Sequence, residues 1–180
     1  MKTIALFGGS FDPPHIAHKA IVESLLSFKD IEKVVIMPTF LNPFKSKSYA
    51  PSNLRVKWLK EIFNKSPNVI ISTFEVEKGK PVPSIESVLY LLKSYQKIYL
   101  VIGADNLSSL HKWNRYTELK SLVTFVVASR DKIDISNDFL KINVDINVSS
   151  TALRQNTEFS QLSPNCANEI EKFYKDNNEK

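Results

Sequence analysis

Short apolar runs alternate along the chain with segments whose apolar residues recur at helical spacing. The runs are rich in β-branched residues and predict buried strands, at residues 3–7, 33–37, 69–72, 98–102 and 122–128. The spaced segments predict helices from about residue 16 to 28, from near Ser52, and from an N-cap at Ser84. The tail is more helical, and Ser163 and Pro164 are predicted to be the cap and first-turn pair of a last helix.

Strands that alternate with helices predict an α/β fold, with a single doubly wound, mostly parallel sheet and helices on both of its faces. In such sheets, ligands bind at the carboxyl ends of the strands, where the strand order reverses. Gly8 follows the first predicted strand, and Gly103 follows the strand at 98–102. We therefore expect the segments that begin at these two glycines to form the ligand site.

The length of 180 residues predicts one domain, residues 1–180, with a helical C-terminal part from about residue 150. A content of 43% hydrophobic and 24% charged residues excludes the disordered and collagen-like classes. The longest apolar runs are far shorter than the ~20 residues that span a bilayer, which predicts no membrane partner. No small-residue cleavage site follows the N-terminal residues, and the single Cys166 cannot form an internal disulfide, so we expect a cytoplasmic protein.

The formal net charge of +5 comes from 24 Lys and Arg against 19 Asp and Glu residues. The lysines are scattered and many have acidic neighbours, as in Lys29-Asp30, whereas a nucleic-acid binder concentrates its basic residues in a patch. We therefore expect no nucleic-acid partner, and a surface with some attraction for small polyanions. A nucleic-acid-binding module is the least favoured alternative, and it predicts binding that weakens steeply with salt.

Residues 8–18, Gly-Gly-Ser-Phe-Asp-Pro-Pro-His-Ile-Ala-His, have the features of a phosphate site. Two glycines let the backbone turn sharply and approach a ligand, and the N-terminus of the helix that follows attracts anions. His15 and His18 share one face of that helix, where phosphate oxygens would lie. By itself a Gly-Gly pair after a strand is a turn. Two histidines at this spacing are also compatible with zinc, although no cysteine or third-ligand cluster accompanies them.

A second candidate phosphate site lies at residues 148–154, Val-Ser-Ser-Thr-Ala-Leu-Arg. Ser149, Ser150 and Thr151 are natural N-cap residues, and a helix that begins among hydroxyl groups offers another place for an anion. Arg154 lies one turn further along and can reach a phosphate. Taken alone, this segment is only a capped helix. The presence of the first segment, well over a hundred residues earlier, favours a paired phosphate site.

The two segments resemble the paired signatures of the nucleotidylyltransferase superfamily. Residues 9–18 are similar to G-x-F-D-P-x-H-x-G-H, with Ala17 in place of the second glycine, and residues 148–154 are similar to I-S-S-T-x-I-R. The resemblance implies a Rossmann-like nucleotidylyltransferase fold. The methyl group of Ala17 is expected to tighten the approach to a triphosphate without removing either histidine.

Two middle segments resemble the nicotinate-mononucleotide branch of that superfamily. Residues 38–45 are similar to P-x-x-x-P-P-H-K, with Phe44 in place of the histidine, Asn42 in place of the first proline of the pair, and Lys45 retained. Residues 102–113 are similar to a segment of the form G-A-D-x-L-x-x-L-x-x-W. In that branch the acidic residue contacts ribose hydroxyls and the tryptophan stacks on the nicotinate ring.

A third middle segment, residues 83–89, is only weakly similar to the P-S-Y-T-x-x-T-L of that branch, whose backbone amides hold the nicotinate carboxylate. Ile85 and Glu86 stand where the branch has Tyr and Thr. A carboxylate at Glu86 disfavours an anionic substrate if it points inward. Outside the resemblance, Asp105 is an ordinary charge at a helix N-terminus, and Trp113 is a core or surface anchor.

The resemblance implies transfer of AMP from ATP to nicotinate mononucleotide in NAD biosynthesis, with both nucleotides as partners and Mg²⁺ bound with the ATP phosphates. It assigns catalysis to His15 and His18, and the acceptor nucleotide to Lys45, Ile85 and Trp113. It assigns no protein metal ligand, and it leaves a monomer or a homo-oligomer open. It assigns ATP and its phosphates to Gly8, Gly9, Ser10, Phe11, Gly103, Asp105, Ser150, Thr151 and Arg154.

Two other functions compete with this interpretation. A pantetheine-phosphate adenylyltransferase or a cytidylyltransferase shares the chemistry but takes a different acceptor, and the segment that holds Asp105 and Trp113 argues against it. A non-catalytic nucleotide sensor on the same fold predicts loss of the phosphate-binding histidines, and both His15 and His18 are present. A profile of acceptor substrates separates these alternatives.

Overall fold

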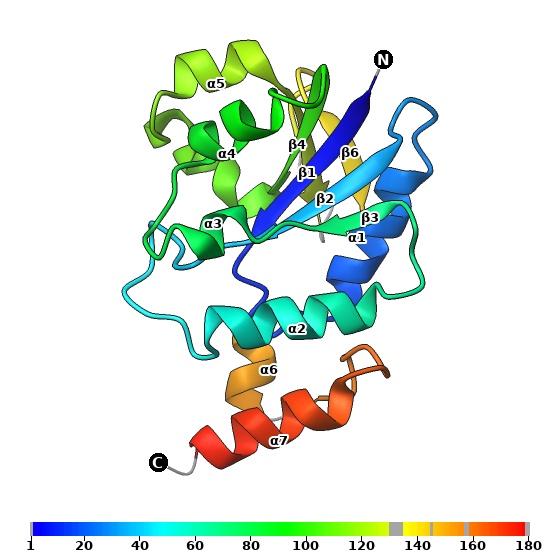
Figure 1. Cartoon of the computed structure of the whole chain (residues 1–180), viewed down its shortest axis with the longest axis vertical. Coiled ribbons are helices and arrows are strands. Elements are labelled where there is room, and N and C mark those ends of the chain that lie inside the picture. Colours follow the sequence, from blue (N-terminus) through cyan, green and yellow to red (C-terminus); the bar gives the residue numbers. More distant parts are fainter. Residues whose placement is uncertain (1, 130–134, 145, 157–158, 179–180) are drawn as a thin grey trace.

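The computed structural model describes residues 2–129, 135–144, 146–156 and 159–178 (Figure 1). Its centre is a six-stranded parallel sheet with the strand order β3-β2-β1-β4-β5-β6, in which the order reverses between β1 and β4. The predicted doubly wound parallel sheet is therefore confirmed. The strands are β1 Thr3–Gly9, β2 Lys33–Pro38, β3 Val69–Ile71, β4 Lys97–Gly103, β5 Thr124–Ser129 and β6 Leu140–Asn143.

Helices cover both faces of this sheet, as the alternation of apolar segments predicts. The helices are α1 Ile16–Leu26, α2 Ser52–Ile62, α3 Phe74–Glu77, α4 Ser84–Leu91, α5 Tyr116–Leu122, α6 Ser150–Asn156, α7 Ala167–Asn178 and the 3₁₀ helix η1 Ala104–Lys112. One apolar cluster packs α1, α2, α6 and α7 on one face, and a second packs α4, α5 and η1 on the other. Figure 1 shows α6 and α7 stacked beyond α2 at one end of the molecule.

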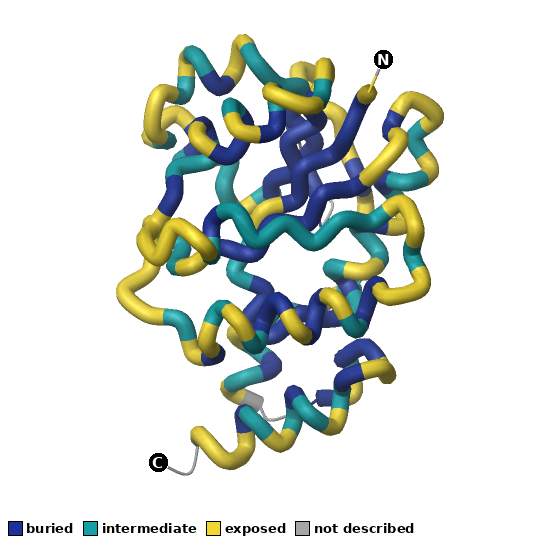
Figure 2. Tube along the Cα trace, in the orientation of Figure 1, coloured by how far each residue is buried: buried dark blue, intermediate teal, exposed yellow. Residues whose placement is uncertain are grey.

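The interiors of the central strands are almost entirely apolar because both of their faces are buried. Along β1, Ile4 and Leu6 belong to the cluster under α4, whereas Ala5 and Phe7 belong to the cluster under α1. Successive side chains of a strand point to opposite faces, so a strand covered on both sides has no polar alternation. Figure 2 shows this buried centre, with exposed residues on the outer helices and loops.

The C-terminal helices pack on the same core as the sheet. Leu153 of α6 and Ile170 and Tyr174 of α7 are buried in the cluster that also holds Trp58 of α2. We propose on this ground that residues 1–180 form a single domain whose helical C-terminal part begins near residue 150.

Most predicted strand and helix ends differ from the observed ones by one or two residues, and the first helix, predicted to reach about residue 28, ends at Leu26. Leu122 ends α5 instead of opening a strand, and β5 begins at Thr124. Helix and strand meet at Val123, whose extended backbone (φ −132°, ψ 160°) ends α5, so no turn residue marks the boundary. The strand predicted at residues 69–72 is one residue too long, because β3 ends at Ile71.

The predicted helix starts at Ser84 and Ser163 also need correction. Pro83 takes the N-cap position of α4 with φ −66° and ψ 143°, and Ser84 is the first helical residue. Ser163 lies in a turn, in which the N–H of Cys166 donates to the Ser163 carbonyl at 3.3 Å, and α7 begins only at Ala167. The elements α3, η1 and β6 were not predicted, because they are short and only lightly buried.

A buried carboxylate, Asp12, joins three distant parts of the chain. Its Oδ2 accepts the N–H of Tyr49 at 2.7 Å, and its Oδ1 accepts the N–H of Ala50 at 3.0 Å and the hydroxyl of Tyr174. Burial and the charge of Asp12 raise the pKa of Tyr174, which keeps its hydroxyl a neutral donor. The carboxylate therefore connects the loop after β1, the loop before α2 and helix α7.

Arg55 of α2 is fully buried and binds backbone carbonyls in the loops that follow β1 and β2. Its guanidinium donates to the carbonyls of Ala50 (3.1 Å), Ser10 (2.5 Å), Thr39 (2.8 Å) and Phe40 (3.1 Å). Burial lowers the pKa of Arg55, and the charge of Asp12 opposes this shift. An arginine stays charged in proteins, so these carbonyls and Asp12 together balance a buried cation.

We expect Tyr174→Phe to lower the free energy of unfolding by about 1.5–3 kcal/mol, because it removes a hydrogen bond to a buried charged group and leaves the ring in place. Urea unfolding followed by circular dichroism measures the change. Tyr90→Phe is the matched control, since Tyr90 is exposed and its ring stacks on Phe74 without a hydroxyl contact to Asp12. Equal stability of the two variants would contradict a structural role for the Tyr174–Asp12 contact.

Candidate active site

Two hollows lie at the carboxyl ends of β1 and β4, where the strand order reverses. The first, here called the Trp113 hollow, has a volume of about 400 Å³, and the second, the histidine hollow, has about 370 Å³. Gly103 lines both. The Trp113 hollow is lined by, among others, Thr39, Phe44, Glu75, Ser84, Asn106 and Trp113, and the histidine hollow by His15, Ala17, His18, Asp105, Ser129 and Asn147.

The two histidines are held by each other and by a phenylalanine. His15 is the N-cap residue of α1, and its N–H donates to Nδ1 of His18 at 3.1 Å. Their rings stack with centroids 3.7 Å apart, and the ring of Phe11 meets His18 edge-on at 4.9 Å. Because Nδ1 of His18 accepts a hydrogen bond, a neutral His18 carries its proton on Nε2. The pair can therefore present a ring N–H donor to an anion in the histidine hollow.

Glycine has a different role here from the predicted one. Gly8 and Gly9 are the last residues of β1, and the left-handed conformation in this segment belongs to Phe11, with φ 49°. A Cβ atom on Gly9 would lie 3.2 Å from the ring of Phe11, and one on Gly103 would lie 2.4 Å from Oδ1 of Asp105. Gly9 and Gly103 thus leave space for neighbouring side chains, and the predicted sharp turn belongs to Phe11. Gly8 and Gly9 also line the Trp113 hollow.

Ala17 is buried in the apolar cluster and also lines the histidine hollow. Its methyl group packs on the core as the second residue of α1. The difference from the usual glycine is therefore accommodated inside the protein.

The second sequence motif lies directly against the first. Ser150 donates to the Pro13 carbonyl at 2.8 Å, and Arg154 donates to the Asp12 carbonyl. Arg154 also donates to Thr151 Oγ1 at 3.1 Å, and its guanidinium lies 4.2 Å from the centre of the Tyr49 ring. The predicted cap is Ser149, whose Oγ accepts the N–H of Ala152 at 3.1 Å. These hydrogen bonds therefore hold together two sequence motifs that lie more than a hundred residues apart in the chain.

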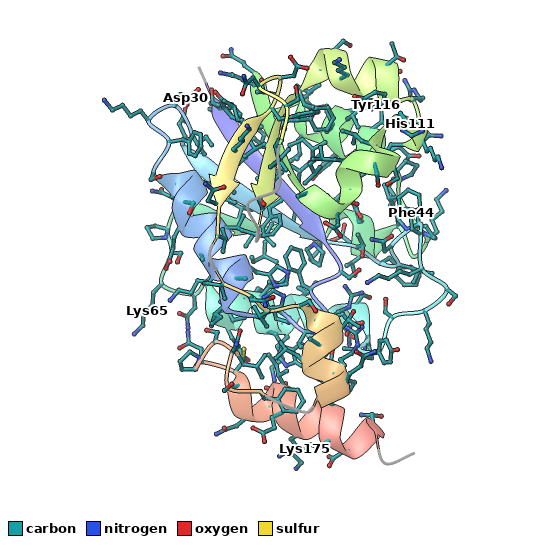
Figure 3. All side chains as sticks on the ribbon, turned by 180° about the vertical axis from the view of Figure 1, so that it is seen from behind. Asp30, Phe44, Lys65, His111, Tyr116 and Lys175 are labelled. Atoms are coloured by element: carbon teal, nitrogen blue, oxygen red, sulfur yellow. The ribbon has the colours of Figure 1, made fainter. Side chains whose placement is uncertain are left out.

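The predicted acceptor residues divide between exposed and buried positions. Trp113 is partly buried and lines its hollow, whereas the side chain of Ile85 lies in the core and leaves only its backbone near the start of α4. Lys45 lies on the exposed loop before α2. Phe44 of that loop is 67% exposed, and it lies toward the same edge of the molecule as His111 (Figure 3).

Three other residues, Asp105, Phe11 and Ser10, were predicted to bind ATP or its phosphates. Asp105 is exposed and lines the histidine hollow, where Asn106 donates to its Oδ1 at 3.2 Å. Phe11 is buried, so only its backbone can meet a ligand. The Ser10 carbonyl accepts from Arg55.

Glu75 is a candidate site residue that the sequence did not reveal. It is 5% exposed, lines the Trp113 hollow, and accepts the hydroxyl of Ser87 on Oε1 at 2.6 Å. Burial raises the pKa of Glu75 to about 7, and the Ser87 hydrogen bond opposes this rise. In the sequence, Glu75 and Glu77 are two similar acids in a polar stretch, and nothing separates the buried one from the exposed one.

The Trp113 hollow has the polar groups of a ligand site. Among the buried side-chain atoms of the described residues that have no hydrogen-bond partner, three belong to residues that line this hollow, namely Thr39 Oγ1, Glu75 Oε2 and Trp113 Nε1. Buried polar groups are nearly always paired in folded proteins. Their occurrence in one wall therefore indicates a ligand with polar substituents beside a flat ring surface.

The described residues contain no group of three or more His, Cys, Asp or Glu side chains that could hold a metal ion. In the same part of the chain, every helix is too short or too polar to cross a membrane.

Known proteins match this chain over nearly its whole length. The model of the Cytidylyltransferase-like family matches residues 6–156. A protein of Sulfurimonas denitrificans named "Probable nicotinate-nucleotide adenylyltransferase" is 61% identical over 176 residues, which are 98% of this chain and 97% of that protein. A protein of Campylobacter fetus subsp. fetus with the same name is 46% identical over 177 residues, which are 97% of this chain and 98% of that protein.

A solved structure shares the fold. It is described as Plasmodium falciparum nicotinic acid mononucleotide adenylyltransferase complexed with NaAD, and it superposes with a TM-score of 0.77 at 18% identity, covering 99% of this chain and 97% of the other. The predicted Rossmann-like nucleotidylyltransferase fold is therefore confirmed.

Proposed function

The chain belongs to the nicotinate-nucleotide adenylyltransferases of the cytidylyltransferase-like family, and from this premise we propose that it transfers AMP from ATP to nicotinate mononucleotide. The products are nicotinate adenine dinucleotide and pyrophosphate, and the reaction is a step of NAD biosynthesis. One observation carries the proposal for this chain: Gly103 separates a hollow with two histidines from a hollow with a tryptophan. Two nucleotides bound in these hollows would meet over the ends of β1 and β4.

ATP fits the histidine hollow. His15 and His18 lie at the start of α1, where the helix dipole favours phosphate groups. Asp105 borders the same hollow and can accept hydrogen bonds from ribose hydroxyls. Gly8, Gly9, Ser10 and Phe11 would line the path of the triphosphate through their backbone. Ser150, Thr151 and Arg154 would hold its β and γ phosphates from the adjoining motif.

Nicotinate mononucleotide fits the Trp113 hollow. A pyridinium ring stacked on the indole of Trp113 gains both stacking and cation–π energy. The backbone at Ile85, near the N-terminus of α4, lies where it can meet the ring carboxylate. Lys45 would hold the acceptor phosphate, because its loop borders this hollow through Asn42, Pro43 and Phe44.

The reaction proposed is a direct in-line displacement. A phosphate oxygen of the mononucleotide attacks the α phosphorus of ATP, the bond from that phosphorus to the bridging oxygen breaks, and pyrophosphate leaves with the electron pair. The protein positions two polyanions and stabilises the charge that moves toward the leaving group. His18 donates from Nε2 and His15 supports it through the stacked ring and the backbone hydrogen bond.

Magnesium is proposed to bind with the ATP phosphates and water, which suits a cation that keeps much of its hydration. When bound, it neutralises phosphate charge and so helps the departure of pyrophosphate. Within the described residues, carboxylates do not gather in a group that could hold it alone. The protein residues contribute the histidine and arginine donors on either side.

Pyrophosphate release tests the proposed function. Purified protein with ATP and magnesium should release pyrophosphate when nicotinate mononucleotide is added, and more slowly with nicotinamide mononucleotide. Activity with neither nucleotide, together with activity on phosphopantetheine, would overturn the assignment of the acceptor.

We expect His18→Asn to lower kcat by about 10²–10³-fold, the range for loss of one donor to developing charge. The Asn Oδ1 can replace Nδ1 as acceptor for the His15 N–H, so the start of α1 is kept while the Nε2–H is lost. Steady-state kinetics and a thermal melt measure the two effects. His111→Asn is the control, because His111 is exposed on η1. An unchanged kcat in His18→Asn would disprove the catalytic role.

We expect Trp113→Ala to raise the KM for nicotinate mononucleotide about tenfold and to leave the KM for ATP nearly unchanged. The estimate takes roughly 1–2 kcal/mol for the lost stacking and cation–π contact. Trp113→Phe should lose less, because a smaller aromatic face remains. A variant in which both KM values rise together would show that Trp113 supports the fold of the site and does not contact one substrate.

A further inference from the structure

Glu75 is buried in the wall of the Trp113 hollow, and the proposed adenylyl transfer assigns it no role. It is 5% exposed and lies on the single turn of α3. Its Oε1 accepts from Ser87 of α4 at 2.6 Å, and its Oε2 has no hydrogen-bond partner among the described residues. A carboxyl group with one oxygen fixed and the other directed to no protein partner suits contact with a bound molecule.

No cation compensates the charge of Glu75 in the described part of the chain. Its carboxylate takes part in none of the ion pairs found there. The titratable groups on α3 and on the elements around it are all exposed, and they are Glu77, Lys78, Glu86, Tyr90, Asp105, His111, Lys112 and Lys33. Burial therefore dominates, and it raises the pKa of Glu75 to about 7.

The polar atoms near Glu75 lie in the wall that would receive a nicotinate ring. Thr39 Oγ1 and Trp113 Nε1 are likewise buried without a hydrogen-bond partner within the described residues, and both residues line the same hollow. Because Glu75, Thr39 and Trp113 line one hollow, a ring stacked on Trp113 could place its 3-substituent against Glu75. In nicotinate the substituent is an anionic acceptor, and in nicotinamide it includes an N–H donor.

On the basis of the proposed function, we propose that Glu75 sets the choice between acid and amide substrates. In its neutral form the carboxyl group donates a hydrogen bond from Oε2 to the nicotinate carboxylate. In its ionised form it repels that carboxylate and accepts a hydrogen bond from the nicotinamide amide. Preference for nicotinate mononucleotide therefore decreases as the pH rises through neutrality.

The ratio of kcat/KM for the two mononucleotides isolates this effect. Effects of pH that do not depend on the 3-substituent of the ring act on both substrates and cancel in the ratio. The kcat/KM profile reports the ionisation of the free enzyme, in which Glu75 titrates near pH 7. The wild-type ratio of nicotinate to nicotinamide mononucleotide should fall at least tenfold between pH 6 and pH 9.

Glu75→Gln is the decisive variant, because its amide reproduces the neutral acid. Its Oε1 can accept from Ser87 while its Nε2–H₂ takes the place of Oε2 as a donor. We expect its ratio to stay at the low-pH value of the wild type at every pH. Ser87→Ala removes a bond that stabilises the ionised form, so the midpoint of the fall should move to higher pH. His111→Gln, a control for a nearby titratable group, should follow the wild type.

Thermal unfolding without substrate checks the titration independently. A raised pKa in the folded state adds stability that is complete below the unfolded value near 4.5 and is lost as the pH rises through about 7. The Tm of the wild type should therefore fall relative to that of Glu75→Gln between pH 5 and pH 8. A Tm difference that does not change with pH would overturn the proposal.

The two proposals fail in different ways. Turnover of both mononucleotides with a pH-independent ratio, or with the same slope in Glu75→Gln, overturns the role of Glu75 and leaves the adenylyltransferase assignment intact. Turnover of neither mononucleotide at any pH overturns the assignment of the acceptor, and the role of Glu75 with it.

Discussion

The buried carboxylate of Asp12 is the constraint on which the site depends. A charge removed from water is costly unless it is paired and hydrogen-bonded, and Asp12 meets this requirement with two loop amides and the hydroxyl of Tyr174. These partners lie before α2 and on α7, and the Asp12 carbonyl also receives Arg154 of α6. The loop after β1 is therefore held in position by contacts with both C-terminal helices.

The hydrogen bonds of Asp12 also influence where the side chains proposed to bind phosphate lie. The cap of α1 follows Asp12 by three residues, so the anchor places His15 and, through the hydrogen bond to Nδ1, the tautomer of His18. Arg154 is brought to the same point from the other end of the chain. Positioning and charge stabilisation, which an adenylyl transfer requires, thus follow from the way the fold balances one buried charge.

The residues proposed to select the acceptor are different from those proposed to bind the phosphates. The sequence departs from the nicotinate branch at Phe44 and at Ile85-Glu86, yet Ile85 is core and Glu86 is exposed, so neither side chain fills the Trp113 hollow from α4. The buried acid in that wall is Glu75, from a different element. A carboxyl group near its pKa donates a hydrogen bond when it is neutral and only accepts when it is ionised, and the role proposed for Glu75 rests on this property.

The sequence by itself determined the parallel sheet, the two motifs at its carboxyl edge and the family, because apolar periodicity and short signatures depend on neighbouring residues. It did not reveal that Phe11, and not a glycine, adopts the left-handed backbone, nor that Asp12 is an anchor with partners 37 and 162 residues away. It also could not separate Glu75 from Glu77, since burial depends on packing between elements. Only the tertiary structure decided which charges are buried and which groups compensate them. The reason is that desolvation acts on residues that meet in space and not along the chain.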